Sequence, residues 1–183
     1  MEEFFLGGRV VVKFGDLAQE ETDAIVNAAN STLMGGGGVD GAIHEAAGES
    51  LLYECKKIRR TDYPNGLPTG EAVITRGGDL KAKFVIHTVG PIYGSNKGKD
   101  AQMLSDCYAN CLRLAAENNI ETVSFPSIST GAFGYPKEEA AQISSQVVED
   151  FLNHNRTIKQ VFLVFYSQND ARIFLENHKF SRR

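Results

Sequence analysis

Short runs of β-branched and aromatic residues alternate along this 183-residue chain with longer segments of helical periodicity. The runs predict six strands: Arg9–Phe14, Ala24–Asn27, Glu71–Thr75, Phe84–Val89, Thr122–Phe125 and Val161–Tyr166. Several of them are continuously apolar, as is typical of strands that helices cover on both faces. The alternation therefore predicts an α/β protein, a three-layer α/β/α sandwich built on a mixed sheet.

Four helical segments accompany the predicted strands. They are Gly41–Arg59 with an interruption near Gly48, Met103–Asn118, Pro136–Asn153 and Asp170–Lys179. The third helix carries an apolar stripe at steps of three, four and four residues, namely Ala140, Ile143, Val147 and Phe151. We expect this stripe to face the core. Residues 76–83 leave no room for a helix, so the strands on either side of them are expected to pair antiparallel.

Length and composition are those of one ordinary globular domain, which we expect to span residues 1–183. The formal net charge of −4 argues against a nucleic-acid binder that relies on a basic surface. No apolar run approaches the roughly 18 residues that a membrane span needs, and the acidic N-terminal residues do not resemble a signal peptide. We therefore expect a cytoplasmic protein that does not associate with membranes, and a monomer.

Three cysteines, Cys55, Cys107 and Cys111, cannot all form disulfides, which indicates a reducing compartment. Cys107 and Cys111 lie one helical turn apart, a spacing that metal ligands also use. No histidine or further cysteine lies at ligand spacing nearby, and a free cysteine is usually a small buried apolar residue. We therefore predict no metal site.

Glycine is enriched, and five of the 18 glycines fall between Gly35 and Gly41. This cluster follows a predicted strand that leads into two asparagines, Asn27 and Asn30, and it precedes a helix that begins beside Asp40. In open α/β sheets, ligands bind outside the carboxyl ends of the strands, and bare backbone N–H groups at a helix start form an anion site. A flexible or merely tight loop is the alternative, but four consecutive glycines are entropically costly for a rigid turn.

A second loop, Pro126–Pro136, also connects a predicted strand to a helix start. It offers small polar, glycine and aromatic side chains: Ser127, Ser129, Thr130, Gly131, Phe133 and Gly134. Neither this loop nor the segment Asn30–Asp40 contains Lys or Arg, so a bound phosphate would be held by backbone N–H groups and hydroxyls. An ordinary helix cap is the alternative.

Three familiar motifs fit these residues poorly. The spacing of Gly36, Gly38 and Gly41 matches the dinucleotide fingerprint, but the loop is too long and no acidic strand end follows about 20 residues later. The stretch Gly94–Lys99 is one residue short of a Walker loop. The nucleophile-elbow pattern around Ser129 lacks its first glycine. Dehydrogenase, P-loop nucleotidase and serine hydrolase functions are therefore disfavoured.

The segments NAANSTLMGGGGVDGAIHEAAG and PSISTGAFGYP resemble the macro domain family, specifically its MacroD-type branch and its bacterial single-domain members. GDL, PTGEAVIT and FVIHTVGP support the resemblance, which extends from Val11 to Asn177. It implies a six-stranded mixed sheet between helices and a cleft for ADP-ribose. It also implies hydrolysis of ADP-ribose from acidic side chains of proteins and deacetylation of O-acetyl-ADP-ribose, with no cofactor.

The resemblance assigns binding roles position by position. Asp16 matches the acid that accepts a hydrogen bond from adenine, Leu17 is its backbone neighbour where the family commonly has Ile, and Tyr166 matches the aromatic beside the adenosine. The pyrophosphate loop corresponds to Ser129, Thr130, Gly131, Ala132 and Phe133, the last replacing a more frequent Tyr. The distal ribose is matched by Asn30 and by the loop Gly37, Gly38, Val39 and Asp40.

For the reaction, our hypothesis is that Asn30 orients the distal ribose and Asp40 positions and partly deprotonates a water. A substrate phosphate oxygen could assist instead. His44, one helical turn beyond Asp40, is given a supporting role. Each residue also has a structural alternative: a turn acid for Asp16, a core aromatic for Tyr166, and local hydrogen bonding, helix capping or packing for the others.

The expected partners are ADP-ribose, mono-ADP-ribosylated proteins and O-acetyl-ADP-ribose, with nucleic acid confined to ADP-ribosylated ends. Two other functions remain open: a reader that binds ADP-ribose without hydrolysis, and an RNA-binding module that uses the same cleft. Readers of the family often lack Asn30 or Asp40, and this chain has both residues. Its negative charge and the two loops without Lys or Arg weigh against RNA.

Overall fold

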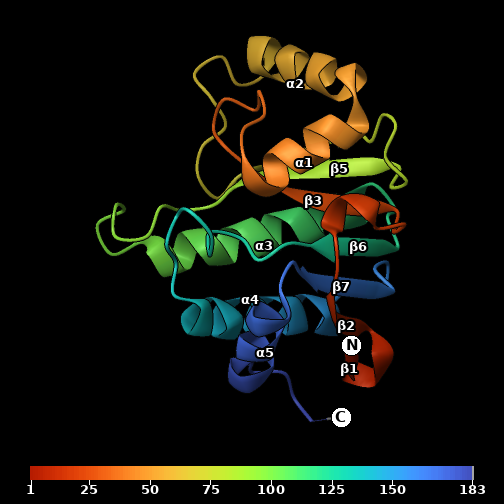
Figure 1. Ribbon diagram of the computed structural model, residues 1–183, viewed down its shortest axis with the longest axis vertical. Coiled ribbons are helices and arrows are strands. Elements are labelled where there is room, and N and C mark those ends of the chain that lie inside the picture. The colour runs from red at the N-terminus through yellow and green to blue at the C-terminus, as the bar shows by residue number, and fades with distance from the viewer. Residues whose placement is uncertain (183) are drawn as a thin grey trace.

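A seven-stranded sheet forms the centre of the protein in the computed structural model, which describes residues 1–182 (Figure 1). The strands are β1 (Glu2–Phe5), β2 (Val10–Phe14), β3 (Ala24–Ala29), β4 (Ala72–Arg76), β5 (Phe84–Val89), β6 (Thr122–Phe125) and β7 (Gln160–Phe165). Their order across the sheet is β1-β2-β7-β6-β3-β5-β4. The five inner strands are parallel and the two edge strands are antiparallel. The expected mixed sheet is therefore confirmed.

All six predicted strands are present, and the predicted antiparallel pair is β4 with β5, in which Thr75 lies opposite Val85. The sheet has seven strands rather than the expected six because β1 pairs with the outer edge of β2. Three of the four residues of β1 are exposed, including Phe4. Because β1 is short and mostly exposed, with only Phe5 packed against the core, it leaves neither an apolar run nor an alternating pattern in the sequence.

Five α-helices cover the sheet: α1 (Gly38–Ala47), α2 (Glu49–Thr61), α3 (Asp100–Glu117), α4 (Lys137–Asn153) and α5 (Gln168–Asn177). Residues of α1 and α2 pack in one apolar core, and residues of α3, α4 and α5 pack in another on the opposite face (Figure 1). Neighbouring residues of β3 divide between them, since Ile25 belongs to the first core and Val26 to the second. The predicted three-layer sandwich is thus confirmed.

The predicted break in the first helical segment occurs at Gly48, where φ is +84° and the N–H bonds to the carbonyl of His44. The predicted stripe on α4 packs against the core, but it lies at the margin of the buried face and not at its centre. Ala140 is buried, but Ile143, Val147 and Phe151 are half-buried, and the buried face is Ala140, Ala141, Ser144, Ser145, Val148 and Leu152. The two serine hydroxyls bond to carbonyls one turn earlier, which makes them acceptable in a core that an apolar stripe does not reveal.

Because β2, β3, β5, β6 and β7 are parallel, their carboxyl ends meet at one edge of the sheet. The segments that leave this edge contain Asp16, Asn30, Gly90, the loop 126–136 and Tyr166. The fold therefore brings together loops that are far apart in the sequence. The three cysteines are buried free thiols. Within residues 1–182, no helix is long and apolar enough to cross a membrane.

Candidate active site

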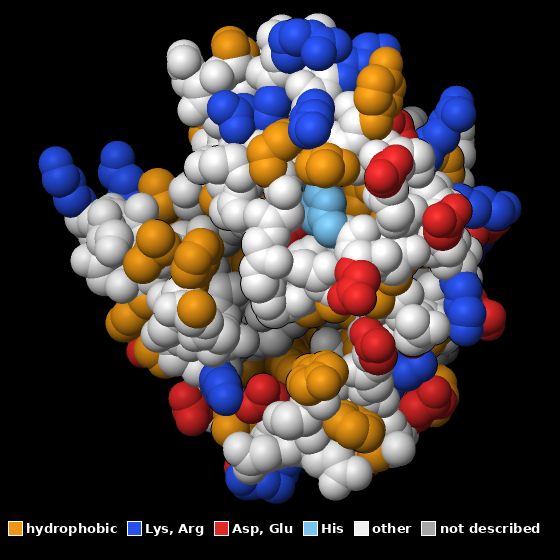
Figure 2. All heavy atoms as spheres, turned by 45° about the horizontal axis from the view of Figure 1, so that its top comes forward, with side chains coloured by type: hydrophobic (Ala, Val, Ile, Leu, Met, Phe, Trp, Pro, Cys, Tyr) orange, Lys and Arg blue, Asp and Glu red, His pale blue; other side chains and the backbone are white. Residues whose placement is uncertain are grey.

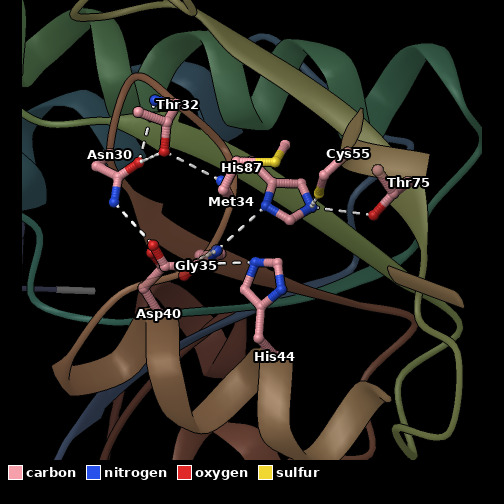
Figure 3. Close-up of polar contacts among 10 residues, drawn as sticks. Asn30, Thr32, Met34, Gly35, Asp40, His44, Cys55, Thr75 and His87 are labelled. Atoms are coloured by element: carbon pink, nitrogen blue, oxygen red, sulfur yellow. Dashed lines mark hydrogen bonds and ion pairs between the residues drawn. The ribbon is translucent and has the colours of Figure 1, made fainter. Parts of the chain in front are cut away.

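Asn30 follows the last residue of β3 and organises the turn that leads to the glycine loop (Figure 3). Its Nδ2 donates to the carbonyl of Gly35 at 3.0 Å, and its Oδ1 accepts from the N–H of Thr32 at 3.0 Å. The local hydrogen bonding that was considered for this residue is therefore present. It fixes the side chain in one orientation at the edge of the sheet.

Gly36 separates the side chains of Asn30 and Asp40. A methyl group at Gly36 would lie 3.3 Å from Asn30 Nδ2 and 3.3 Å from Asp40 Oδ2. An amide donor and a carboxylate oxygen thus face the same small space, which only a residue without a side chain leaves open. The structure brings together the two residues to which the reaction was assigned from the sequence.

Asp40 lies in the first turn of α1 and is only 5% exposed. Its Oδ1 accepts a hydrogen bond of 2.8 Å from Asn27 Nδ2. The cap position of α1 is Gly37, without a side-chain cap, so the interpretation of Asp40 as a helix cap is wrong. Its charge at the helix N-terminus is still favoured by the helix dipole.

His44 lies one turn after Asp40 and packs its ring against Gly35, where a Cβ atom would be 3.4 Å from the imidazole. Its Nε2 is 3.5 Å from Asp40 Oδ1. That nitrogen is buried and has no hydrogen-bond partner among residues 1–182. His44 therefore combines packing against the glycine loop with a buried nitrogen beside the Asp40 carboxylate.

Behind Asp40, sequence reasoning missed a buried polar chain that Figure 3 shows crossing the sheet. Asn27 Nδ2 lies 3.1 Å from His87 Nδ1, and His87 Nε2 lies 3.0 Å from Thr75 Oγ1. Burial, and secondarily the charge of His44, lower the pKa of His87 to about 3, so this imidazole is neutral near pH 7. A histidine within the apolar run of β5 was the one signal available in the sequence.

The second loop follows β6, which pairs with β3, so it lies beside the glycine loop. Ser129 has a φ of +66° and a buried hydroxyl without a partner among residues 1–182. The main-chain N–H groups of Ser129 to Phe133 and of Gly35 to Asp40 donate no hydrogen bond to any of residues 1–182. Open space surrounds the Cβ positions of Gly37, Gly38 and Gly131. The two loops thus present unpaired donors to solvent, as an anion site requires.

The residues assigned to adenine lie at the ends of β2 and β7. Asp16 is exposed and accepts from the N–H of Ala18 at 3.0 Å, so it does act as a turn acid, while the neighbouring Leu17 is buried. Tyr166 is 82% exposed. It is therefore not a core aromatic, and its ring is free to pack against a ligand.

The surface of the molecule is hollowed beside a stretch of backbone with few side chains, as Figure 2 shows. An open groove of about 800 Å³ lies between α2 and the turn after β4, and none of the assigned residues lines it. Among residues 1–182, no three His, Cys, Asp or Glu side chains are grouped as metal ligands would be.

Comparison with known proteins identifies the family. The family model described as "Macro domain" matches residues 26–144, which include the glycine loop and the loop after β6. The chain belongs to the macro domain family. The matched residues include both segments that suggested the resemblance, the glycine loop Gly35–Gly41 and the loop Pro126–Pro136.

Named relatives of this macro domain match over nearly their whole lengths. The O-acetyl-ADP-ribose deacetylase of Citrobacter koseri is 49% identical over 166 residues, covering 91% of this chain and 93% of the relative. A mutant of the Oceanobacillus iheyensis macrodomain with ADPR superposes with a TM-score of 0.91 at 43% identity, covering 97% of this chain and 95% of that one. The same macrodomain with ADP gives a TM-score of 0.89 at 43% identity, with coverage of 97% and 93%.

Proposed function

We propose that this macro domain binds ADP-ribose and hydrolyses its esters, namely O-acetyl-ADP-ribose and mono-ADP-ribose attached to acidic side chains of proteins. The observation that carries this proposal is the geometry of Asp40. One oxygen of this buried carboxylate is held by Asn27, and the other faces the gap beside Asn30. Relatives named O-acetyl-ADP-ribose deacetylase and neighbours with ADPR or ADP support the choice of ligand.

In this proposal, the unpaired N–H groups of the glycine loop and of the loop from Ser129 to Phe133 bind the pyrophosphate. Fixed backbone dipoles can hold an anion without Lys or Arg, neither of which occurs in the two loops. Tyr166 stacks on the adenosine and Asp16 accepts from the adenine amino group. This arrangement directs the distal ribose toward Asn30 and Asp40.

The attacking water forms a bond to a carbon of the distal ribose while the bond from that carbon to the ester oxygen breaks, so the carboxylate, or acetate from the small ester, leaves with the electron pair and ADP-ribose is released. Asp40 Oδ2 accepts a hydrogen bond from the attacking water and takes up its proton as the bond forms. Asn30 orients the sugar and donates to the attacking water, and His44 supports Asp40, whose Oδ1 lies 3.5 Å from the buried His44 Nε2. A positioned carboxylate base typically contributes roughly 10²–10⁴-fold in rate. The carboxylate product is a good leaving group, so the demand for a general acid is small.

The test measures ADP-ribose binding and ester hydrolysis side by side for the wild type, Asn30→Ala and Asp40→Asn. The substrates are O-acetyl-ADP-ribose and a protein that carries ADP-ribose on Asp or Glu. We expect Asp40→Asn to keep the ADP-ribose affinity within a few-fold and to lose about 10²–10⁴-fold in kcat. Asp150→Asn, an exposed carboxylate on α4, is the matched control. A wild type that binds ADP-ribose and leaves both esters intact would instead be a reader.

A further inference from the structure

We propose that His87 is a positioning residue that acts through Asn27 to set the orientation of the Asp40 carboxylate. This inference deepens the proposed function and rests on it. His87 touches no residue that was assigned to substrate binding from the sequence, and the sequence motifs gave it no role. Its importance comes from a hydrogen-bonded chain that joins three strands of the sheet to the first turn of α1.

The chain begins with a direct pairing of two strands. Asn27 on β3 and His87 on β5 are register partners in adjacent parallel strands, and both side chains are fully buried. The hydrogen bonds from Asn27 to Asp40 and to His87 place both side chains on the face of the sheet that α1 covers. Two polar side chains buried side by side in an apolar sheet are costly unless their hydrogen bonds are satisfied.

The two protons of the Asn27 amide determine the state of His87. One proton goes to Asp40 Oδ1 at 2.8 Å, and the other goes to His87 Nδ1 at 3.1 Å. His87 Nδ1 must therefore be the unprotonated nitrogen, and the neutral ring carries its proton on Nε2. That proton has an acceptor in Thr75 Oγ1 at 3.0 Å. The Cys55 sulfur, 3.9 Å from Nε2, stays a thiol because burial raises its pKa to about 12.

The reverse orientation of the Asn27 amide is disfavoured by the Asp40 carboxylate. Rotating the amide by 180° would place its oxygen against the Asp40 carboxylate, where two acceptors repel. In the present orientation Asn27 Oδ1 has no partner among residues 1–182, so its two donated bonds alone hold the side chain. Removing the acceptor at His87 would leave only the bond to Asp40, and the carboxylate could then turn away from the gap at Gly36.

The sharpest test is made at Thr75, which is three hydrogen bonds away from Asp40. Thr75→Val keeps the shape of the side chain but removes the acceptor that stabilises the Nε2–H form of His87. The Nδ1–H form would then compete, and its proton would oppose the Asn27 amide. We expect kcat of Thr75→Val to fall about 10–100-fold, while the KM for O-acetyl-ADP-ribose and the ADP-ribose affinity stay within about twofold of the wild type. Thr75→Ser keeps the hydroxyl and should restore kcat.

The control variant is Ser124→Ala, which removes a buried hydroxyl from β6 that bonds to Thr22 and Glu20 outside the site. It should lose stability comparably and keep the wild-type kcat. A second variant, Asn27→Asp, places another carboxylate beside Asp40. The pair would share a proton, so the acid limb of the pH–kcat profile should move to higher pH by about one unit or more. This shift tests whether residue 27 contacts the catalytic carboxylate, while the Thr75 variants test the part played by His87.

A further measurement does not depend on turnover: the ¹⁵N resonances of the His87 ring report which nitrogen carries the proton. An Nδ1–H ring in the wild type would overturn the inference. So would wild-type kcat in Thr75→Val together with an unshifted pH profile in Asn27→Asp. A wild type that binds ADP-ribose without hydrolysis would instead refute the proposed function, and the ring tautomer would still test the geometry.

Discussion

Gly36→Ala is the substitution that most directly tests where the attacking water sits. The φ of Gly36 lies outside the left-handed region, so alanine can adopt the same backbone conformation without strain. Its methyl carbon would lie 3.3 Å from both Asn30 Nδ2 and Asp40 Oδ2. A water that bonds to both groups needs about 2.8 Å to each of them, so it would occupy the space of this methyl group.

The expected magnitudes follow from that overlap. Excluding the water removes the contribution of the general base, so kcat should fall by roughly 10²–10⁴-fold, or about 3–5 kcal/mol in the activation free energy. The free energy of unfolding of Gly36→Ala should barely change, because the cost of the tight methyl contacts at 3.3 Å is offset by the lower entropy that alanine gives the unfolded chain. The melting temperature should therefore stay within about 4 °C of the wild type.

The assay compares the initial rate of acetate release from O-acetyl-ADP-ribose with the melting curve and the calorimetric affinity for ADP-ribose. Gly37→Ala gives the contrast, because nothing lies within 4 Å of its Cβ position and the gap stays open. Any loss there should affect ligand affinity more than kcat. If Gly36→Ala hydrolyses the ester at the wild-type rate while folded, the water does not sit between Asn30 and Asp40.

Three further outcomes are expected. The folded-state pKa of His87 is about 3, against 6.5 in an unfolded chain, so the unfolded state binds more protons between these values. The free energy of unfolding should fall by up to about 1.4 kcal/mol per pH unit as the pH drops from 6.5 toward 3. Urea titrations at several pH values should show that the unfolding free energy of His87→Asn depends less steeply on pH. Tyr166→Ala should weaken ADP-ribose binding by about 1–3 kcal/mol without lowering the melting temperature; an unchanged calorimetric Kd would argue against stacking. Gly41→Ala should lose about 1–3 kcal/mol because its methyl group overlaps the Gly36 carbonyl, and a wild-type melting curve would contradict this.

Features that depend only on consecutive residues in the chain were predicted closely from the sequence. The bounds of β5 and β6 were predicted to the residue, because short runs of β-branched and aromatic residues between turn residues favour strands. The glycine cluster and the placement of Asn30 and Asp40 were also readable, since a strand, a bare loop and a helix start follow one another directly in the chain. The antiparallel pair β4 and β5 followed from the short connection between them.

Features that depend on contacts between distant segments were not readable. The edge strand β1 is short and mostly exposed, and the face that α4 buries depends on the helices and the sheet around it. Tyr166 was predicted as the last residue of an apolar strand, but β7 ends at Phe165 and the Tyr166 ring beyond it is exposed. Each of these outcomes depends on which elements become neighbours in the folded chain.

The sequence by itself therefore determined the α/β class, the positions of the loops and the identity of the residues at the carboxyl edge of the sheet. Only the tertiary structure decided what holds those residues in place. Asn27, His87 and Thr75 are up to 60 residues apart, and they meet only because β3, β5 and β4 are neighbours in the sheet. Periodicity is a local property of the chain, whereas strand order is set by the packing of the whole domain, so the buried chain behind Asp40 emerged only in the fold.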